Sequence, residues 1–201
     1  SLGGQDVKAE AAPVVVVPTD LSGWLIRTID ADTADEEMLQ ALAQTGGDPT
    51  AIFDLVRGFG FEAYRGSLRG TRGTLWSGAG NSLDQSSLLI AMLRASGIPA
   101  RYRHGTLSQA NVQTLIVSMF PAPTAIIGQV APEVPISDPV NDPDLIAEIQ
   151  DHWWVEAYLD GAWTDLDPSF ADAAIGQRFA SQVATDGTDR IAELTDDEWF
   201  A

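Results

Sequence analysis

A tight turn at Asp160-Gly161 constrains the fold of this 201-residue chain more than any other feature. An Asp-Gly pair between aromatic and branched residues is typical of a two-residue hairpin of type I′, in which both turn residues adopt positive φ. In such a hairpin Leu159 opposes Ala162, and this first pair fixes the partner of every residue farther along the strands. We therefore expect an antiparallel hairpin over residues 151–167.

This register brings His152 close to Asp167. Trp154 faces Asp167 directly, and His152 lies one diagonal step away on the same face, where neighbours are roughly 7–8 Å apart by Cα. A carboxylate on one imidazole nitrogen fixes the tautomer and leaves the other nitrogen free as a base. The same register opposes Glu156 to Asp165, which is unfavourable unless that end is solvated or a bulge shifts the pairing. The hairpin thus predicts part of a catalytic triad. The competing interpretation is an ordinary hairpin whose aromatic residues pack into the core.

A helix is predicted over residues 81–96, ending at Gly97 with Pro99 after it. Its apolar positions recur at helical spacing and are Leu88, Leu89, Met92 and Leu93.

Ser82 opens this helix and has two interpretations. It can cap the helix, with Gln85 three residues on as in a capping box and Asp84 favoured by the positive end of the helix dipole. It can also be a nucleophile, because the free amides of a first turn stabilise an oxyanion and the dipole lowers the pKa of an attacking group. Asp84 points about two hundred degrees away from Ser82 on the helix, so we do not expect it to act as a nucleophile.

The remaining organisation is expected to comprise a linker or extension over residues 1–20, a domain over 21–170 and an acidic tail or appendage over 171–201. Thr33, with Glu36 and Glu37 behind it, is the expected start of one helix, and Asp48-Pro49 the cap of a second. The other expected elements are an extended segment from Phe61 to Leu68, a strand from Ile98 to His104, a helix or strand from Val112 to Phe120, and a loop over 121–144, which holds six prolines.

The charge balance excludes several classes of function. Eleven basic residues against 29 acidic ones give a net charge of −18, which disfavours nucleic acid and anionic membranes as partners. No stretch approaches the roughly 18–20 apolar residues of a membrane helix, so membrane insertion is not expected.

The supply of reactive side chains is also limited. The chain has no cysteine, which excludes disulfides, cysteine-ligated zinc and a thiol nucleophile. Of its two histidines, we expect His104 to be a structural or surface residue. No metal or cofactor is expected. The polar cluster Asp138, Asn141, Asp142 and Asp144 lacks the spacing and glycine of an EF-hand, which favours a solvated loop over a calcium site.

Three segments in order resemble the transglutaminase-like, papain-related superfamily. Gly80-Asn81-Ser82, followed by a leucine-rich helix and Gly97-Ile98-Pro99-Ala100-Arg101, is similar to the family's nucleophile helix and the strand after it. His152-Trp153-Trp154-Val155-Glu156 is similar to its His-Ala-Trp-Val-Glu, and Trp163 to Ser169 to its Trp…Asp-Pro-Thr. The spacing to Gly97 puts Ser82 where the family carries its catalytic cysteine.

This resemblance, over roughly residues 35–170, implies an α+β fold in which N-terminal helices, including the nucleophile helix, pack on an antiparallel sheet. It implies that Ser82, His152 and Asp167 are the nucleophile, the general base and the orienting carboxylate. The stretch from Tyr64 to Leu75 looks like a bacterial branch of large, often secreted proteins. That favours an extracellular or cell-envelope location, a place in a larger chain, and a protein or peptide as substrate or partner.

Two departures from the family pattern bear on activity. The first is serine at position 82, for which three explanations are open: an engineered substitution, a natural serine in a domain that only binds, or a natural and active serine hydrolase. The second is the long gap between Ser82 and His152, where the proline-rich loop is a lid, a substrate wall or, as we favour, plain surface. The expected function is acyl transfer or amide hydrolysis, and the alternative is a pseudoenzyme that binds peptides or organises a larger secreted protein.

Overall fold

The structure, a computed structural model, describes residues 19–120 and 138–182. Its helices are η1 (Thr19–Leu25), α1 (Glu36–Thr45), α2 (Pro49–Arg57), α3 (Gly70–Ser77), α4 (Ser82–Ala95), α5 (Gln109–Met119), η2 (Pro139–Asn141) and α6 (Pro143–Gln150). Its strands are β1 (Gly60–Phe61), β2 (Ala79–Gly80), β3 (Ala100–Leu107), β4 (Asp151–Leu159), β5 (Ala162–Leu166) and β6 (Ala180–Gln182).

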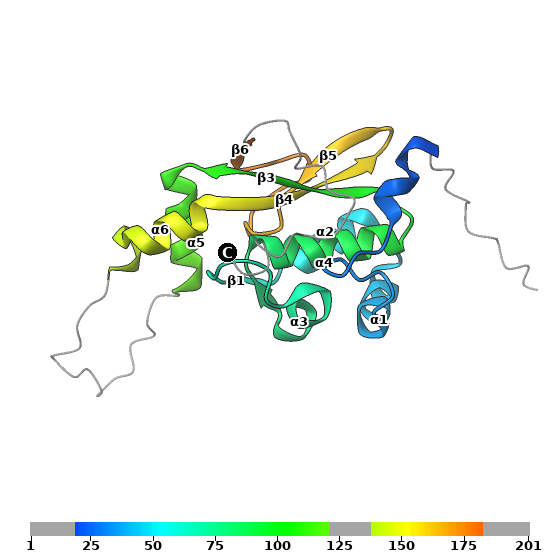
Figure 1. Cartoon of the computed structure of the whole chain (residues 1–201), viewed down its shortest axis with the longest axis horizontal. Helices are drawn as coiled ribbons and strands as arrows, with labels where there is room; N and C mark the ends of the chain where they lie inside the picture. Colours follow the sequence, from blue (N-terminus) through cyan, green and yellow to red (C-terminus); the bar gives the residue numbers. More distant parts are fainter. Residues whose placement is uncertain (1–18, 121–137, 183–201) are drawn as a thin grey trace, which may run out of the picture.

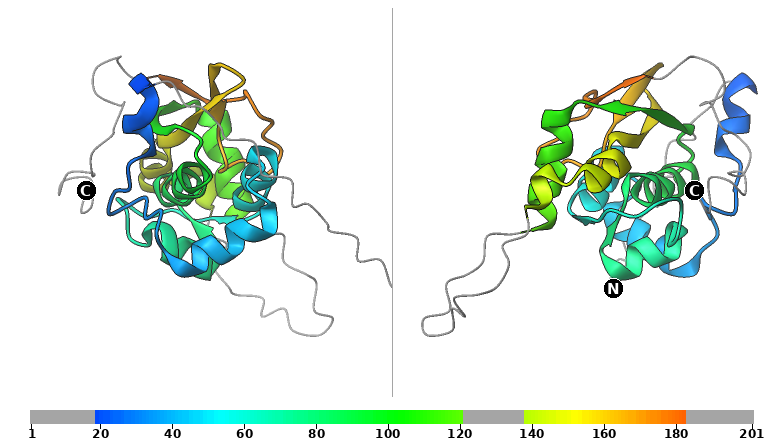
Figure 2. Two further views of the ribbon diagram at one scale, coloured as in Figure 1. Left: turned by 90° about the vertical axis from the view of Figure 1, so that its right-hand side faces the viewer. Right: turned by 60° about the vertical axis from the view of Figure 1, so that its left-hand side comes forward.

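A four-stranded antiparallel sheet, in the order β5-β4-β3-β6, lies over the central helix α4 (Figure 1). The helices α1, α2 and α3 pack around the faces of α4 that point away from the sheet, while α5 and α6 lie together at one end. In the left view of Figure 2, α4 is seen nearly end-on in the middle of the molecule. The expected α+β fold, with the nucleophile helix packed on an antiparallel sheet, is therefore confirmed.

The helix α4 is the centre of the core, as every residue from Ser82 to Arg94 is buried. It begins one residue later and ends one residue earlier than predicted, with Asn81 and Ser96 as its caps, and Gly97 beyond it has a φ of 78°, which favours glycine. The largest fully buried side chains around it are Trp154, Tyr102, Phe53, Met38, Ile52, Leu107 and Leu115. A helix buried on all sides favours hydrogen bonds for its polar side chains, and those of Asn81, Asp84 and Gln85 shape the site below.

The hairpin has the predicted turn and register. Asp160 and Gly161 have φ values of 51° and 86°, as a type I′ turn requires. Leu159 pairs with Ala162, and the ladder continues in step to the pair of Val155 with Leu166.

Glu156 faces Asp165 as predicted, without a bulge. Arg101 on β3 stands next to this pair and holds the Glu156 carboxylate at 2.7 Å. Asp165 accepts a hydrogen bond of 2.7 Å from the indole of Trp154. The like charges are tolerated because each carboxylate has its own partner, and the arginine comes from a neighbouring strand that the hairpin sequence does not reveal.

The start of α1 differs from the prediction. Asp35, not Thr33, is the N-cap, and its carboxylate accepts hydrogen bonds from the amides of Glu37 and Met38. Burial alone would raise the pKa of Asp35, but these hydrogen bonds and the guanidinium of Arg72 outweigh burial and lower it. The cap of α2 by Asp48 is confirmed.

Three further segments refine the sequence-based expectations. The extended segment from Phe61 to Leu68 is wrong beyond Phe61, because β1 ends there and the following loop turns back to bind α4. The expected strand from Ile98 to His104 runs instead from Ala100 to Leu107, which puts His104 inside it. The ambiguous segment from Val112 to Phe120 is helical, within α5.

Most of the expected loop over 121–144, residues 121–137, lies outside the described part of the chain. Its last residues, 139–144, form η2 and the start of α6, two elements that the prolines did not suggest. Proline is compatible with both, since it occupies the first turn of each.

The division of the chain into extension, domain and tail stays a prediction. Residues 1–18 and 183–201, which make up most of the expected extension and tail, are not described. Within the expected tail, however, Ala173 and Ala180 are buried in the core, and β6 pairs with β3. Residues 171–182 thus add to the folded unit.

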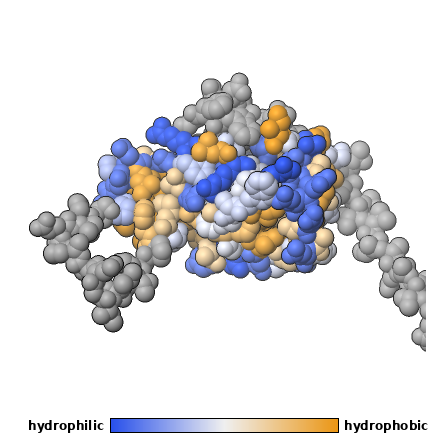
Figure 3. Space-filling model, turned by 90° about the horizontal axis from the view of Figure 1, so that it is seen from below, coloured by the Kyte–Doolittle hydropathy of each residue, from blue (hydrophilic) through white to orange (hydrophobic). Residues whose placement is uncertain are grey.

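The described surface mixes charged and apolar side chains, as the face seen from below shows (Figure 3). Its exposed large apolar side chains include Ile29, Leu68 and Trp76. Among the described residues, no helix has the length and apolar character needed to cross a bilayer.

The cap of α1 gives a test of the fold. We expect Asp35→Ala to lower the free energy of unfolding by about 1 kcal/mol, because two amides lose their acceptor. Because the pKa of Asp35 is lowered in the folded state, its contribution is present above the unfolded pKa of about 3.9 and is lost as the pH falls through the folded value. Urea denaturation at pH 7 and at acidic pH measures both effects. Thr33→Ala is the control. An equal loss of unfolding free energy in that variant would contradict Asp35 as the N-cap of α1.

Candidate active site

His152 and Asp167 form a buried pair at the far end of the hairpin from its turn. The Nε2 atom of His152 lies 2.9 Å from Oδ2 of Asp167, and neither side chain is exposed to solvent. The diagonal contact predicted from the hairpin register is therefore present. With Nε2 engaged by the carboxylate, the ring orientation is fixed and Nδ1 is left for other chemistry.

The surroundings of this pair exclude water. The ring of Phe170 stands edge-on to His152 with ring centroids 5.8 Å apart. The second oxygen of Asp167 accepts a hydrogen bond from the amide of Ser169 at 3.3 Å. Within the described part of the chain, His152 Nδ1 is buried and has no hydrogen-bond partner. A buried nitrogen without a partner is costly for stability, which favours a functional reason for it.

Ser82 does not cap its helix, contrary to one of the two interpretations. Asn81 is the N-cap of α4, and its side-chain oxygen accepts from the amide of Asp84 at 2.8 Å. Gln85 does not complete a capping box either, because its amide group donates to the carbonyl of Gly60. The hydroxyl oxygen of Ser82 accepts a hydrogen bond of 3.2 Å from the backbone amide of Trp153, the residue after His152.

This bond joins the start of α4 to the first residues of β4, so Ser82 and His152 lie on adjoining segments. The amides of Ser82 and Leu83 occupy the first two positions of the helix, where backbone N–H groups have no intrahelical acceptor. Both residues line a pocket. The amides are therefore placed, with the positive end of the helix dipole, to bind an oxygen that acquires negative charge.

Asp84 is the anchor of the loop that forms one wall of this pocket. Its carboxylate accepts hydrogen bonds of 2.7 Å from the hydroxyls of Tyr64 and Ser67, and of 2.9–3.2 Å from the amides of residues 68–70. Burial raises the pKa of Tyr64, and the negative charge of Asp84 raises it further. Asp84 is fully buried and its oxygens are occupied, so it positions the loop and cannot attack a substrate.

Asn81 holds the same loop from the other side. Its side-chain nitrogen donates to the carbonyls of Tyr64 and Gly66, at 2.8 Å each. The sequence alone predicts no role for Asn81 or Tyr64. No local signal could have revealed one, because the contacts span 15–17 positions in the chain.

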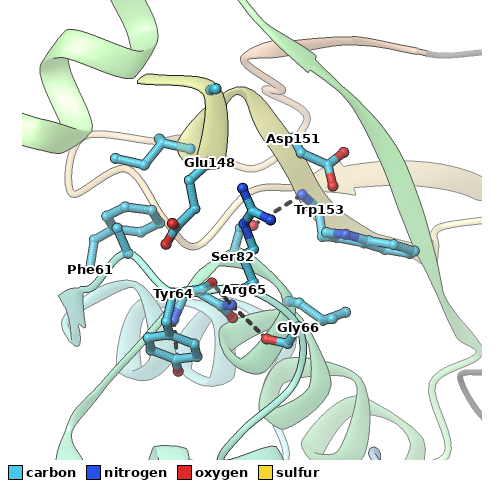
Figure 4. Close-up of a pocket in the computed structure, with 13 residues that line it drawn as sticks. Phe61, Tyr64, Arg65, Gly66, Ser82, Glu148, Asp151 and Trp153 are labelled. Carbon is cyan, nitrogen blue, oxygen red and sulfur yellow. Dashed lines mark hydrogen bonds between the residues drawn. The ribbon is translucent and has the colours of Figure 1, made fainter. Parts of the chain in front are cut away.

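The pocket above Ser82 has a volume of about 290 Å³ and lies between this loop, the start of α4, the end of α6 and the start of β4 (Figure 4). Its lining residues are Phe61, Ala63, Tyr64, Arg65, Gly66, Asn81, Ser82, Leu83, Ala147, Glu148, Ile149, Asp151 and Trp153. The wall from α6 lies just beyond the expected proline-rich loop. Whether that loop is lid, wall or plain surface stays a prediction.

His104 lies close to the site. Its ring stacks on Trp153, with centroids 4.4 Å apart, and its Nε2 contacts the carboxylate of Asp151. These contacts steady the first residues of β4, where His152 is located. The role is structural, as predicted, but it serves the site directly.

The described residues contain no group of three or more histidine, aspartate or glutamate side chains arranged to hold a metal ion. In the polar cluster near residue 140, Asp142 caps α6 and Asp138 accepts a hydrogen bond from Asn141. Both acidic residues are exposed.

Comparison with known proteins gives two matches. A family model described as the transglutaminase-like superfamily matches residues 32–168. Among solved structures, the fold is similar to that of a "Putative Cysteine Protease" from Cytophaga hutchinsonii, with a TM-score of 0.51 and 21% sequence identity. The match covers 80% of this chain and 45% of that one, so this chain spans less than half of that protein. At this identity the likeness concerns the fold alone. The comparison with curated proteins finds no match.

The role of Asp84 can be tested through stability. In Asp84→Asn one oxygen becomes an NH2 group, which meets hydrogen-bond donors in either orientation of the amide. We expect the free energy of unfolding to fall by about 3 kcal/mol, because buried donors lose their acceptor. Urea denaturation measures the change.

Asp54→Asn is the control, since it removes the same charge from an exposed ion pair with Arg57 and should cost less than about 0.5 kcal/mol. Equal losses in the two variants would show that Asp84 does not anchor the loop.

Proposed function

The chain belongs to the transglutaminase-like superfamily, and on that basis we propose that the pocket at Ser82 is an acyl-transfer site for amide bonds in peptides or proteins. One observation carries the proposal: a fully buried His152–Asp167 pair whose second imidazole nitrogen has no partner in the described structure, next to the helix start that holds Ser82. An ordinary hairpin has no reason to bury such a pair.

The proposed reaction assigns one role to each group. The side chain at position 82 attacks the carbonyl carbon, and its proton passes to Nδ1 of His152. The amides of Ser82 and Leu83 stabilise the oxyanion, and His152 then gives its proton to the leaving amine nitrogen. Water or a second amine releases the acyl group from position 82. Asp167 keeps the imidazole in orientation throughout.

Serine makes this site slower than a thiol would. In the family, the nucleophile is a thiol that reacts as a preformed thiolate, whereas a hydroxyl needs a base aligned on its own proton. The hydroxyl of Ser82 accepts from the Trp153 amide, and no hydrogen bond joins it to His152 in the described chain. This geometry suits a thiolate site better than a serine hydrolase.

The same hydrogen bond favours a second candidate function, a peptide-binding module without catalysis. In that case the pocket, the loop anchored by Asp84 and the free amides would hold a peptide carbonyl without cleaving the chain. Both candidates use the same pocket, and they differ in whether a thiol at position 82 becomes reactive.

Ser82→Cys separates the two. Because the chain has no other cysteine, iodoacetamide reports on this thiol alone. We expect labelling at pH 6 to be at least about tenfold faster than for Ser118→Cys, an exposed control thiol whose pKa should stay near 8.5. The advantage should vanish in Ser82→Cys combined with His152→Ala. The Ser82→Cys protein should also hydrolyse or transamidate peptide amides at least about a hundredfold faster than the serine form.

Equal labelling of the two thiols at pH 6, together with no turnover of any peptide, would rule out the acyl-transfer site and leave the binding module.

A further inference from the structure

The pocket at Ser82 has charged groups on opposite sides. Figure 4 shows Glu148 reaching down from α6 toward Phe61 and Tyr64, while Arg65 rises beside Ser82. Glu148 is half-buried and Arg65 is exposed. The two do not form an ion pair, so each presents its charge to whatever enters the pocket.

The other acidic groups near the pocket are already engaged. The carboxylate of Asp151 contacts Nε2 of His104, and Glu62, next to the wall of the pocket, pairs with Arg69. In the described part of the chain, Glu148 makes no hydrogen bond or ion pair. It is thus the lining carboxylate that remains available to a ligand.

The walls around Glu148 are apolar. Phe61 is the last residue of β1, Ala63 belongs to the loop after it, and Ala147 and Ile149 flank Glu148 on the end of α6. A carboxylate beside apolar side chains in one pocket matches a side chain with a hydrocarbon stem and a cationic head. The half-burial of Glu148 reduces screening by salt, and the net charge of −18 attracts cations to the whole surface.

From this arrangement we infer that the pocket selects peptides with a lysine or arginine side chain near the amide presented to Ser82, and that Glu148 binds the cationic head. The inference deepens the proposed function, since it names the substrate class of the same site. Arg65 determines on which side of the pocket the cationic head binds. Its positive charge repels a cation from the side next to Ser82, so binding on the Glu148 side is favoured.

The cation is recognised here, and it is not the attacking amine of a transfer reaction. Arginine, whose guanidinium is a poor nucleophile, should therefore bind as well as lysine. A site for an attacking amine would accept lysine and reject arginine.

Binding to the unaltered serine protein tests the inference without catalysis. Blocked pentapeptides of the form Gly-Ala-Xaa-Ala-Gly, with lysine, arginine, leucine or glutamate at Xaa, are titrated by isothermal calorimetry. We expect lysine and arginine peptides to bind at least about tenfold more tightly than the leucine peptide, as a hydrogen bond to a charged group implies. Glu148→Gln should reduce that preference to less than about threefold.

Two further variants complete the design. Asp144→Asn removes the same charge from an exposed position on the same helix and should leave the preference unchanged. Glu148→Lys should reverse the binding preference in favour of the glutamate peptide. This variant provides a second measurement if Glu148→Gln is poorly folded. An unchanged preference for cations in both Glu148 variants overturns the inference, and so does the absence of measurable binding by every peptide.

Turnover by the Ser82→Cys protein separates this inference from the proposed function. If that protein cleaves leucine and lysine peptides at equal rates, the acyl-transfer site stands and the selectivity fails. If it cleaves none of them and its thiol labels no faster than that of Ser118→Cys at pH 6, but Glu148 still governs binding of the cationic peptides, the selectivity stands and the acyl-transfer site fails.

Discussion

The buried carboxylate of Asp84 is the interaction on which the arrangement of the site depends. A charge without solvent must find several hydrogen-bond donors, and Asp84 takes them from two hydroxyls and three successive amides of the loop before α3. The loop is thereby held against the first turn of α4. Since Ser82 and the pocket wall both belong to this junction, one carboxylate sets the position of Ser82 relative to the wall that faces it.

A second junction joins the helix to the hairpin. The amide of Trp153 donates to Ser82, and the stacking of His104 on Trp153 steadies the same stretch of β4. His152 lies between Asp151 and Trp153, both of which are held by neighbours. The orientation of the imidazole therefore rests on the sheet as well as on Asp167. Ser82 and His152 lie on a helix and a strand, and the wall contributed by α6 follows a segment outside the described part of the chain.

The serine at position 82 leaves this framework in place. The helix start is capped by Asn81, so the hydroxyl of Ser82 is not needed as the cap. The His152–Asp167 pair is buried, and Nδ1 of His152 has no hydrogen-bond partner in the described structure. In the proposed function, serine in place of a thiol changes the pKa of the attacking group and its need for an aligned base. The proposed site would then keep its geometry and its pocket while its rate falls.

The sequence by itself determined those features that depend on short-range rules. The Asp160-Gly161 turn fixes a register, and a register is enough to bring His152 to Asp167. The apolar spacing and Gly97 likewise define α4. The tertiary structure decided everything that needs two distant segments: Asn81 and not Ser82 as the cap, Asp84 as the anchor of the loop, Arg101 as the partner that lets Glu156 face Asp165, and α6 as a wall carrying Glu148. A local pattern shows which residues an element presents, but the partners of a buried charge come from wherever the fold brings donors within reach.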